Sequence, residues 1–387
     1  MRGKTTYPCT IMRGGTSKGI FLMEKDLPRD AALRDRIILA IFGSPDLRQI
    51  DGLGGADSIT SKLALIAPAA EPDRDINYTF GAVGIEKAFV DYSANCGNIS
   101  SAVGPYAIDK GLVKAVVPFT VVRIFNTNTK KMIYAKVPVK KGKFTPDGDY
   151  AIAGCPGTGA RIELSFMDPG GATTGRLLPT GHAVDEVILA SGERYAATIV
   201  DAGNPTAFIR AEDLKLRGDE LPTEFDQDTA TRAKLEAIRK KVGELMGIQV
   251  SQSIPKISFI AAARDFRTTT GETIEKGSVS LLARVMAMGK MHKAFAITAG
   301  IPAAIGAILP DSVVNRVVSE GSPASSRREV VIGHPLGVMD VKVDARLGKG
   351  GAHVVSCTVG RTARKIMDGR VFVSGKIYTA KGCREPL

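Results

Sequence analysis

Hydrophobic and polar positions alternate over short stretches through much of the chain, with a few helical segments between them. Apolar runs at residues 8–12 and 20–23 flank the polar segment 13–19, and this order predicts a β-hairpin with a polar tip. Apolar residues at helical spacing predict an amphipathic helix over residues 26–42, and the apolar run 63–67 predicts a further strand.

The next part of the pattern leads into a run of small residues. Residues 84–92 alternate enough to predict a strand. Residues 100–108 are small and mostly apolar, which predicts a buried helix that begins near Asn95 or Cys96. Further strands are expected at residues 76–80, 116–125, 132–139 and 160–166.

A second unit with the same order of parts begins near residue 185. Its hairpin places Gly203 where the first has Gly15, a separation of 188 residues (203 − 15). His292 precedes a small apolar helix much as Cys96 does, 196 residues further on (292 − 96). The other expected elements are a polar helix at 226–246, strands at 256–263 and 279–285, and the apolar helix at 294–309.

This weak internal duplication predicts two similar α/β domains that face each other. The expected boundaries are 1–184 for the first domain and 185–387 for the second, with a final strand that can return to the first. The first domain carries Lys62 and Cys96, and the second carries Lys290 and His292.

Cys96 lies between two asparagines at the expected start of the small-residue helix. The free N–H groups and positive end of a helix lower the pKa of a thiol placed there, and they also bind carboxylates. Asn95 and Asn98 can cap the helix or donate hydrogen bonds, and Gly97 allows a ligand close to the backbone. The alternative interpretation is a buried cysteine that acts as a small hydrophobe.

Two loops that are rich in glycine and hydroxyl groups add candidate donors. The first carries Thr16 and Ser17 at the hairpin tip, where a plain glycine turn is the alternative. The second ends at Lys62, just before an apolar strand. Lys62 can be a cationic clamp for a carboxylate, a base, or a lysine at a strand edge that extends to water. The other candidate binding residues of the second loop are Gly54, Gly55 and Ser58.

Composition narrows the classes of function. Hydrophobic residues make up 44% and charged residues 24% of the chain, as in ordinary globular proteins. Tryptophan is absent and aromatic content is 6%, which disfavours a groove that stacks bases or sugars. The net charge of +12 is scattered and carries no nucleic-acid-binding motif, but it can steer a small polyanion.

Five cysteines without a paired spacing or a zinc pattern fit a reducing cytoplasm, and no metal site is expected. The first eight residues lack the apolar core of a signal peptide, and no run approaches the length of a membrane span. We therefore expect a cytoplasmic protein that associates with neither membrane nor nucleic acid. A homo-oligomer is compatible with the sequence, which leaves the oligomeric state open.

Several of these stretches resemble the PrpF family, which holds 2-methylaconitate isomerases, 3-methylitaconate Δ-isomerases and 4-oxalomesaconate tautomerases. The resemblance runs through most of the chain, and its motifs lie at residues 12–19, 51–55, 60–62, 95–98 and 288–292. It implies the diaminopimelate-epimerase-like fold of the α/β (α+β) class. In that fold each of two similar domains is a curled, mostly antiparallel sheet around a central helix, and the active site lies in the cleft between them.

The resemblance also implies roles for individual residues. Lys62 and Cys96 match the proton-transfer residues of the family, and Lys290 falls at a lysine that some members use. The carboxylate-binding loops of the family match Thr16, Ser17, Asn95, Gly97 and Asn98. Diaminopimelate epimerase and proline racemase have a second cysteine where this chain has residues 290–293, so a symmetric two-thiol racemisation is not expected.

The resulting hypothesis is a cofactor-independent allylic 1,3-proton shift in a small unsaturated di- or tricarboxylate. The first candidates are a 3-methylitaconate Δ-isomerase and a 2-methylaconitate isomerase. A 4-oxalomesaconate tautomerase or an aconitate isomerase is the alternative. Two further alternatives are an amino-acid epimerase or racemase on the same fold and a non-catalytic protein that binds acids.

Overall fold

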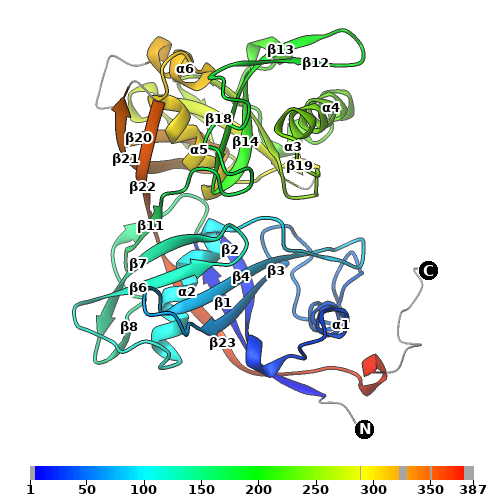
Figure 1. Ribbon diagram of the computed structural model, residues 1–387, viewed down its shortest axis with the longest axis vertical. Coiled ribbons are helices and arrows are strands. Elements are labelled where there is room, and N and C mark those ends of the chain that lie inside the picture. Colours follow the sequence, from blue (N-terminus) through cyan, green and yellow to red (C-terminus); the bar gives the residue numbers. More distant parts are fainter. Residues whose placement is uncertain (1–4, 288, 322–328, 349–350, 379–387) are drawn as a thin grey trace.

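Two hairpins and the strands beside them form two lobes in the computed structural model, which describes residues 5–287, 289–321, 329–348 and 351–378 (Figure 1). The strands of the first lobe are β1 Thr6–Gly14, β2 Ser17–Met23, β3 Lys62–Pro68, β4 Ile76–Val83, β5 Val90–Asp91, β6 Phe119–Asn126, β7 Lys131–Lys140, β8 Lys143–Phe144, β11 Ile162–Met167 and β23 Ala363–Phe372. Its helices are α1 Ala31–Phe42 and α2 Gly97–Asp109.

The second lobe is also built from strands and a few helices. Its strands are β12 Asp185–Ile188, β13 Arg194–Ala202, β14 Asn204–Arg210, β15 Lys256–Ala262, β18 Leu281–Ala287, β19 Lys290–Met291, β20 Glu329–His334, β21 Gly337–Gly348 and β22 Gly351–Arg361. Its helices are α3 Pro222–Phe225, α4 Thr229–Met246, α5 Ile297–Ile308 and α6 Val313–Gly321. Two small two-stranded ribbons pair β9 Tyr150–Ala151 with β10 Thr158–Gly159, and β16 Phe266–Arg267 with β17 Thr273–Ile274.

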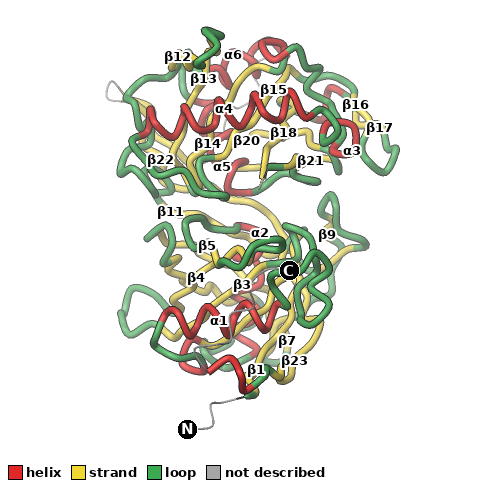
Figure 2. The backbone as a smooth tube through the Cα atoms, turned by 90° about the vertical axis from the view of Figure 1, so that its right-hand side faces the viewer, coloured by secondary structure: helices red, strands yellow, loops and turns green. Residues whose placement is uncertain are grey.

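The strands that lie between two helices of a lobe are buried on both faces, which explains why β3 and β14 are almost continuously apolar. In β3, Ala64 and Ile66 belong to the core around α2, whereas Leu63 and Leu65 belong to the core under α1. Strand β14 shows the same division between α5 and α4. Figure 2 shows α1 and α4 on the same side of the molecule, each over the sheet of its own lobe.

The two lobes share a pairing order. In the first, β1 and β2 form an antiparallel hairpin, and β3 then runs parallel to β2. In the second, β13 and β14 form the hairpin, and β15 runs parallel to β14. The central helices α2 and α5 each follow a very short strand, β5 and β19, and each contains a proline. The repeated order read from the sequence is therefore present in the strand pairing.

The last long strands connect the lobes. Strand β22 pairs with β21 of the second lobe and with β11 of the first. Strand β23 then pairs with β1 along the register from Thr6–Phe372 to Gly14–Ala363. Residues near the C-terminal end thus complete the sheet that the N-terminal strand begins. The division after residue 184 stays a prediction.

Three predicted elements have different bounds. The helix expected from residue 26 begins at Ala31, because Leu27 precedes a proline and is extended, and Asp30 caps the first turn. The polar helix expected from residue 226 begins at Thr229, where Asp228 is the cap. Of the strand expected over residues 84–92, only β5 is a strand, because residues 84–89 form a turn closed by Gly84 and Phe89.

Within the described residues, no single helix has both the length and the apolar character needed to cross a bilayer. The bent pair α5 and α6 would meet that test only when the two helices are taken together.

Candidate functional site

Cys96 occupies the N-cap of α2, and every residue of the helix from Gly97 to Ile108 is buried. Small residues allow this close burial: a Cβ added to Gly97 would lie 2.7 Å from Cβ of Ile297. The first N–H groups of a helix have no acceptor within it, so those after Cys96 remain available to an anion. Cys96 as a whole residue is 9% exposed, and it lines a cavity.

The amine of Lys62 lies beside this thiol. Lys62 is the first residue of β3, and its Nζ donates to Sγ of Cys96 at 3.2 Å and to Oγ of Ser17 at 2.9 Å. All three side chains are buried. The pairing of β2 with β3 explains the contact with Ser17, because it sets the two adjacent strand ends side by side. A thiol and an amine in direct contact can pass a proton between them.

The cavity beside this pair is lined by residues of both lobes. The first lobe contributes Ser58, Lys62, Phe80, Ala82, Ala94, Asn95, Cys96, Gly97 and Asn98. The second contributes Gln252, Ser253, Lys256, Ala287, His292, Ala296, Ile297 and Thr298. The structure thus brings Lys62, Cys96 and His292 together with the Asn95–Asn98 segment.

Two helix N-termini meet at this cavity. Ala296 is the N-cap of α5, as Cys96 is of α2, and the residues after each cap line the cavity. Two carboxylates of one substrate could therefore each accept hydrogen bonds from a helix N-terminus. By its position at the helix cap, the counterpart of Cys96 in the second lobe is Ala296, 200 residues away (296 − 96). The sequence analysis had instead placed this counterpart within residues 290–293. The second lobe therefore offers no thiol at the symmetric position.

A buried asparagine joins the two helix starts. Asn204 of β14 accepts a hydrogen bond from N–H of Asn95 at 3.0 Å and donates to the carbonyl of Asn95 at 3.0 Å. The same amide donates to Oγ1 of Thr298 at 2.9 Å. Asn95 in turn accepts from N–H of Cys96 at 2.7 Å through its side-chain oxygen. These contacts fix the backbone of Cys96 relative to α5.

The hairpin tip contacts the helix start from the other side. Asn98 Oδ1 accepts from N–H of Thr16 and from Nε of Arg361, both at 3.3 Å. Gly15 has φ +52° at this point, and an added Cβ would lie 2.1 Å from Oδ1 of Asn98. Both the turn and the contact therefore require glycine here. Oγ1 of Thr16 is buried without a partner in the described part of the chain.

Five candidates from the sequence lie outside the cavity lining: Thr16 and Ser17, which contact Asn98 and Lys62 from behind it, and Gly54, Gly55 and Lys290. Gly54 packs on Gln49, and Gly55 packs on Thr60. Lys290 is exposed on β19, and the first residue of its motif, Met288, lies outside the described residues. Sequence reasoning missed five polar residues of the site, namely Asn204, Gln252, Ser253, Lys256 and Thr298. The duplicated hairpin was the one available signal for Asn204.

His292 is buried in the cavity wall as a neutral ring. Burial, reinforced by the charges of Lys62 and Lys256, lowers its pKa from 6.5 to about 3. Its Nδ1 accepts a hydrogen bond from N–H of Ala294 at 3.1 Å. The proton of the neutral ring is therefore on Nε2, which can donate to a substrate oxygen.

We expect His292 to make folding sensitive to acid. The unfolded ring binds a proton near pH 6.5 and the folded ring only near pH 3, so its stabilising contribution is complete above pH 6.5 and is lost toward pH 3. Between pH 8 and pH 5 this loss is about 2 kcal/mol. Urea unfolding of the wild type and of His292→Gln at both pH values measures it. Parallel changes in the two free energies of unfolding would contradict the assignment.

No group of three or more His, Cys, Asp and Glu side chains in the described ranges is arranged to hold a metal ion. The chemistry that this chain itself offers at the cavity is a thiol, amines, an imidazole and backbone N–H groups.

Comparison with known proteins places these features in a family context. The model of the PrpF protein family matches residues 4–374. The 3-methylitaconate isomerase of Eubacterium barkeri is 45% identical over 382 residues, which cover 96% of this chain and 98% of that protein. The 2-methyl-aconitate isomerase of Shewanella oneidensis is 38% identical, with 94% and 96% covered. The 4-oxalomesaconate tautomerase of Pseudomonas putida is also 38% identical, with 96% and 97% covered.

Solved structures give the same result for the fold. A crystal structure of a methylitaconate Δ-isomerase matches with a TM-score of 0.79 and 43% identity, over 99% of each chain. A hydroxyproline epimerase from Agrobacterium vitis matches with a TM-score of 0.55 at 13% identity, over 96% of this chain and 94% of the other. The predicted diaminopimelate-epimerase-like fold is confirmed.

Proposed function

The chain belongs to the PrpF family, and we propose that it is a cofactor-independent isomerase that moves a C=C double bond within a small unsaturated di- or tricarboxylate. The observation that carries this proposal is the contact of Lys62 Nζ with Cys96 Sγ at a cavity where two helices begin. The favoured substrates are 3-methylitaconate and 2-methylaconitate, which the names of two relatives support.

The reaction needs a base in contact with a weakly acidic C–H bond and donors at the carboxylate oxygens. In the proposed mechanism the Cys96–Lys62 pair takes the allylic proton, with Cys96 as the catalytic cysteine. Charge then spreads into an extended enolate. The N–H groups that begin α2 and α5, together with Nε2–H of His292, stabilise that charge where it gathers on carboxylate oxygens.

The arrangement of the cavity favours an acid with at least two carboxylates. Asn95 and Asn98 hold the start of α2 in place, and Ser17 orients the amine of Lys62. Thr16 supports Asn98 through its N–H group rather than from the cavity lining. Ser58 lies in the lining and can reach a substrate oxygen. Two lysines, Lys62 from the first lobe and Lys256 from the second, then match a polyanionic ligand.

A 4-oxalomesaconate tautomerase is the second candidate, supported by the relative from Pseudomonas putida. It uses the same elementary step, removal of a proton at one end of an allylic unit and its return at the other. Aconitate isomerisation belongs to the same set.

Incubation with each of these acids in deuterium oxide, followed by proton NMR, tests the proposal. We expect migration of the double bond with deuterium incorporation in at least one acid. Deuterium incorporation without migration, in an amino acid such as proline, would instead indicate an epimerase. Binding of the acids without any exchange would indicate a non-catalytic protein.

We also propose a reducing, cytoplasmic location. The four cysteines among the described residues, Cys9, Cys96, Cys155 and Cys357, are all free thiols, and Cys383 lies outside those residues. Free thiols of this kind persist in reducing compartments.

A further inference from the structure

Arg361 is a buried arginine at the junction of the two lobes. It is the last residue of β22, and the chain then crosses through Thr362 to β23 of the first lobe. The carbonyl of Thr362 accepts from N–H of Gly15 at 2.9 Å, which sets this crossing against the tip of the first hairpin. Arg361 is 6% exposed and contacts Sδ of Met339 in the second lobe through Nη2. Its Nε donates to Oδ1 of Asn98, so it also reaches the start of α2.

No carboxylate of the described residues lies within 4.0 Å of this guanidinium. Its Nη1 donates to the carbonyl of Gly360 at 2.7 Å. Burial lowers the pKa of Arg361 from 12.5 to about 10, against smaller opposing effects from Tyr150 and Asp340, so the group stays charged at neutral pH. A buried charge without a counter-ion costs stability. The position of Arg361 is therefore better explained by function than by stability.

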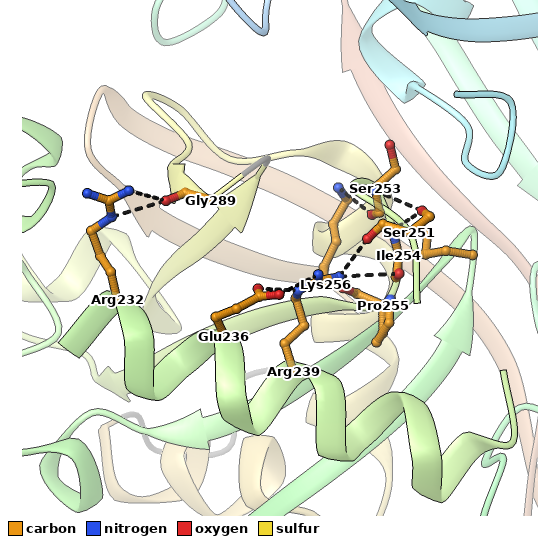
Figure 3. A network of polar contacts seen from close by, with 9 residues as sticks. All are labelled: Arg232, Glu236, Arg239, Ser251, Ser253, Ile254, Pro255, Lys256 and Gly289. Atoms are coloured by element: carbon orange, nitrogen blue, oxygen red, sulfur yellow. Dashed lines mark hydrogen bonds and ion pairs between the residues drawn. The ribbon is translucent and has the colours of Figure 1, made fainter. Parts of the chain in front are cut away.

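Arg239 of α4 is a contrasting arginine that serves the fold. Its Nη1 donates to three main-chain carbonyls of the loop before β15, at 2.9, 3.3 and 3.3 Å. Glu236 pairs with the same guanidinium at 2.7 Å, and Figure 3 shows both side chains rising from the helix toward the loop. Arg239 thus anchors a loop and has its counter-ion beside it. Arg361 lacks the counter-ion, and its contact with Asn98 leads to the cavity.

The contacts of Asn98 determine the orientation of its side-chain amide. Oδ1 accepts from N–H of Thr16 and from Nε of Arg361, both at 3.3 Å. A reversed amide would place its NH₂ group against these two donors, so the oxygen must face them. Nδ2 has no acceptor among the described residues, and it is not one of the atoms that are sealed in the protein without a partner. Because Asn98 lines the cavity, its NH₂ group is open to a ligand there.

We propose that Arg361 is a positioning residue of the active site: with N–H of Thr16, it holds the amide of Asn98 so that Nδ2 donates to a carboxylate of the bound acid. This inference rests on the isomerase function proposed above. Asn98 is the second residue of α2, so its NH₂ group lies beside the N–H groups that begin the helix. One carboxylate oxygen can accept from those N–H groups while the other accepts from Nδ2. Arg361 is not part of the cavity lining, and it therefore acts through Asn98.

Replacement of Arg361 by methionine removes the donor to Asn98 and leaves the reacting groups in place. With an acid that the wild type isomerises, we expect KM to rise by about tenfold and kcat to stay within about threefold. The dissociation constant of tricarballylate, a saturated tricarboxylate, should rise by the same factor in isothermal titration calorimetry. Arg364→Met, at an exposed arginine of β23, is the matched control and should keep all three values.

A double-mutant cycle with Asn98→Ala separates positioning from other roles. If Arg361 acts through Asn98, adding Arg361→Met to Asn98→Ala should raise KM by less than about twofold. If the charge of Arg361 attracts the acid directly, or if the residue only maintains the fold, the two effects multiply and the inference is wrong.

Asn98→Asp tests the orientation of the amide independently of Arg361. The change replaces the NH₂ donor by a charged acceptor, so KM should rise further than it does in Asn98→Ala. A KM for Asn98→Asp at or below that of Asn98→Ala would show that the oxygen faces the acid, and it would overturn the inference.

Thermal unfolding followed by circular dichroism identifies any variant that does not fold. Arg361→Lys keeps the buried charge but loses the planar set of donors, and it replaces Arg361→Met in the cycle if the methionine variant is unfolded. Wild-type KM and tricarballylate affinity in the folded variant would overturn the inference and leave the isomerase assignment in place. Absence of migration by the wild type with every acid would remove that assignment, whereas tricarballylate binding would still test the role of Arg361. Absence of both turnover and binding would remove both.

Discussion

Replacement of Cys96 by alanine is expected to lower turnover by at least about 10³-fold with the acid that the wild type isomerises. The thiol is the one group at the start of α2 that can carry the abstracted proton, and it contacts Lys62 directly. Binding should change less, because the N–H groups of the two helices do not depend on the side chain. Steady-state kinetics should therefore show a loss in kcat with a KM that stays within a few-fold.

Cysteine chemistry supplies the controls for this experiment. Cys155 is partly exposed and outside the cavity lining, so Cys155→Ser should retain activity. Iodoacetamide should inactivate the wild type through Cys96, and a saturating polycarboxylate should slow that inactivation. Full turnover by Cys96→Ala would remove the proposed mechanism. Unchanged acid binding in a protein that never turns over any acid would favour the non-catalytic alternative.

The position of Cys96 could be predicted from sequence because its signal is local. A run of small residues follows it, and small residues allow a helix to be buried on all sides, as α2 is. The start of the helix could be placed within a residue or two. Lys62 could also be identified as a candidate from the sequence, because it lies between a polar loop and an apolar strand. That their side chains touch follows only from the pairing of β3 with β4 and of β4 with β5, the strand that leads to Cys96.

Lys256 escaped prediction because its signal is not local. The chain has 52 lysines and arginines, and this one simply begins a strand. Its importance depends on the parallel pairing of β14 with β15, which are separated by α3 and α4. Once that pairing is known, the duplication predicts a partner for Lys62. The offsets of 188 and 196 residues found in the sequence bracket the 194 residues that separate Lys62 from Lys256 (256 − 62). The duplication was therefore predicted correctly, although its implication for Lys256 was not recognised.

The C-terminal strands show the same limit on a larger scale. Most residues of strand β23 are exposed to solvent, and its sequence does not indicate which strand it pairs with. It nevertheless pairs with β1 across more than three hundred residues of sequence. The prediction of a strand over residues 84–92 was mostly wrong for the opposite reason. The alternation of residues was typical of a strand, but a tight turn from Gly84 to Phe89 replaces most of it. Long-range pairing and turn geometry both lie outside what periodicity encodes.

Replacement of Lys62 by methionine is expected to lower turnover by about 10³-fold, because the variant keeps the volume of the side chain but removes the amine that contacts Cys96. The buried contact with Ser17 makes this amine a fixed part of the site rather than a surface charge. Kinetics of the purified variant with the same acid measure the effect. Lys87→Met, at an exposed lysine of the same lobe, is the matched control and should leave turnover unchanged.

Lys62→Arg then decides what the amine does. If Lys62 supplies only positive charge to a carboxylate, the arginine variant should regain most of the turnover. If it exchanges a proton with Cys96, arginine should not restore activity, since a guanidinium stays protonated. The contact of 3.2 Å with the thiol favours the second result, because a clamp would be directed at the substrate rather than at sulfur. Recovery in Lys62→Arg would leave Cys96 as the sole base on this wall.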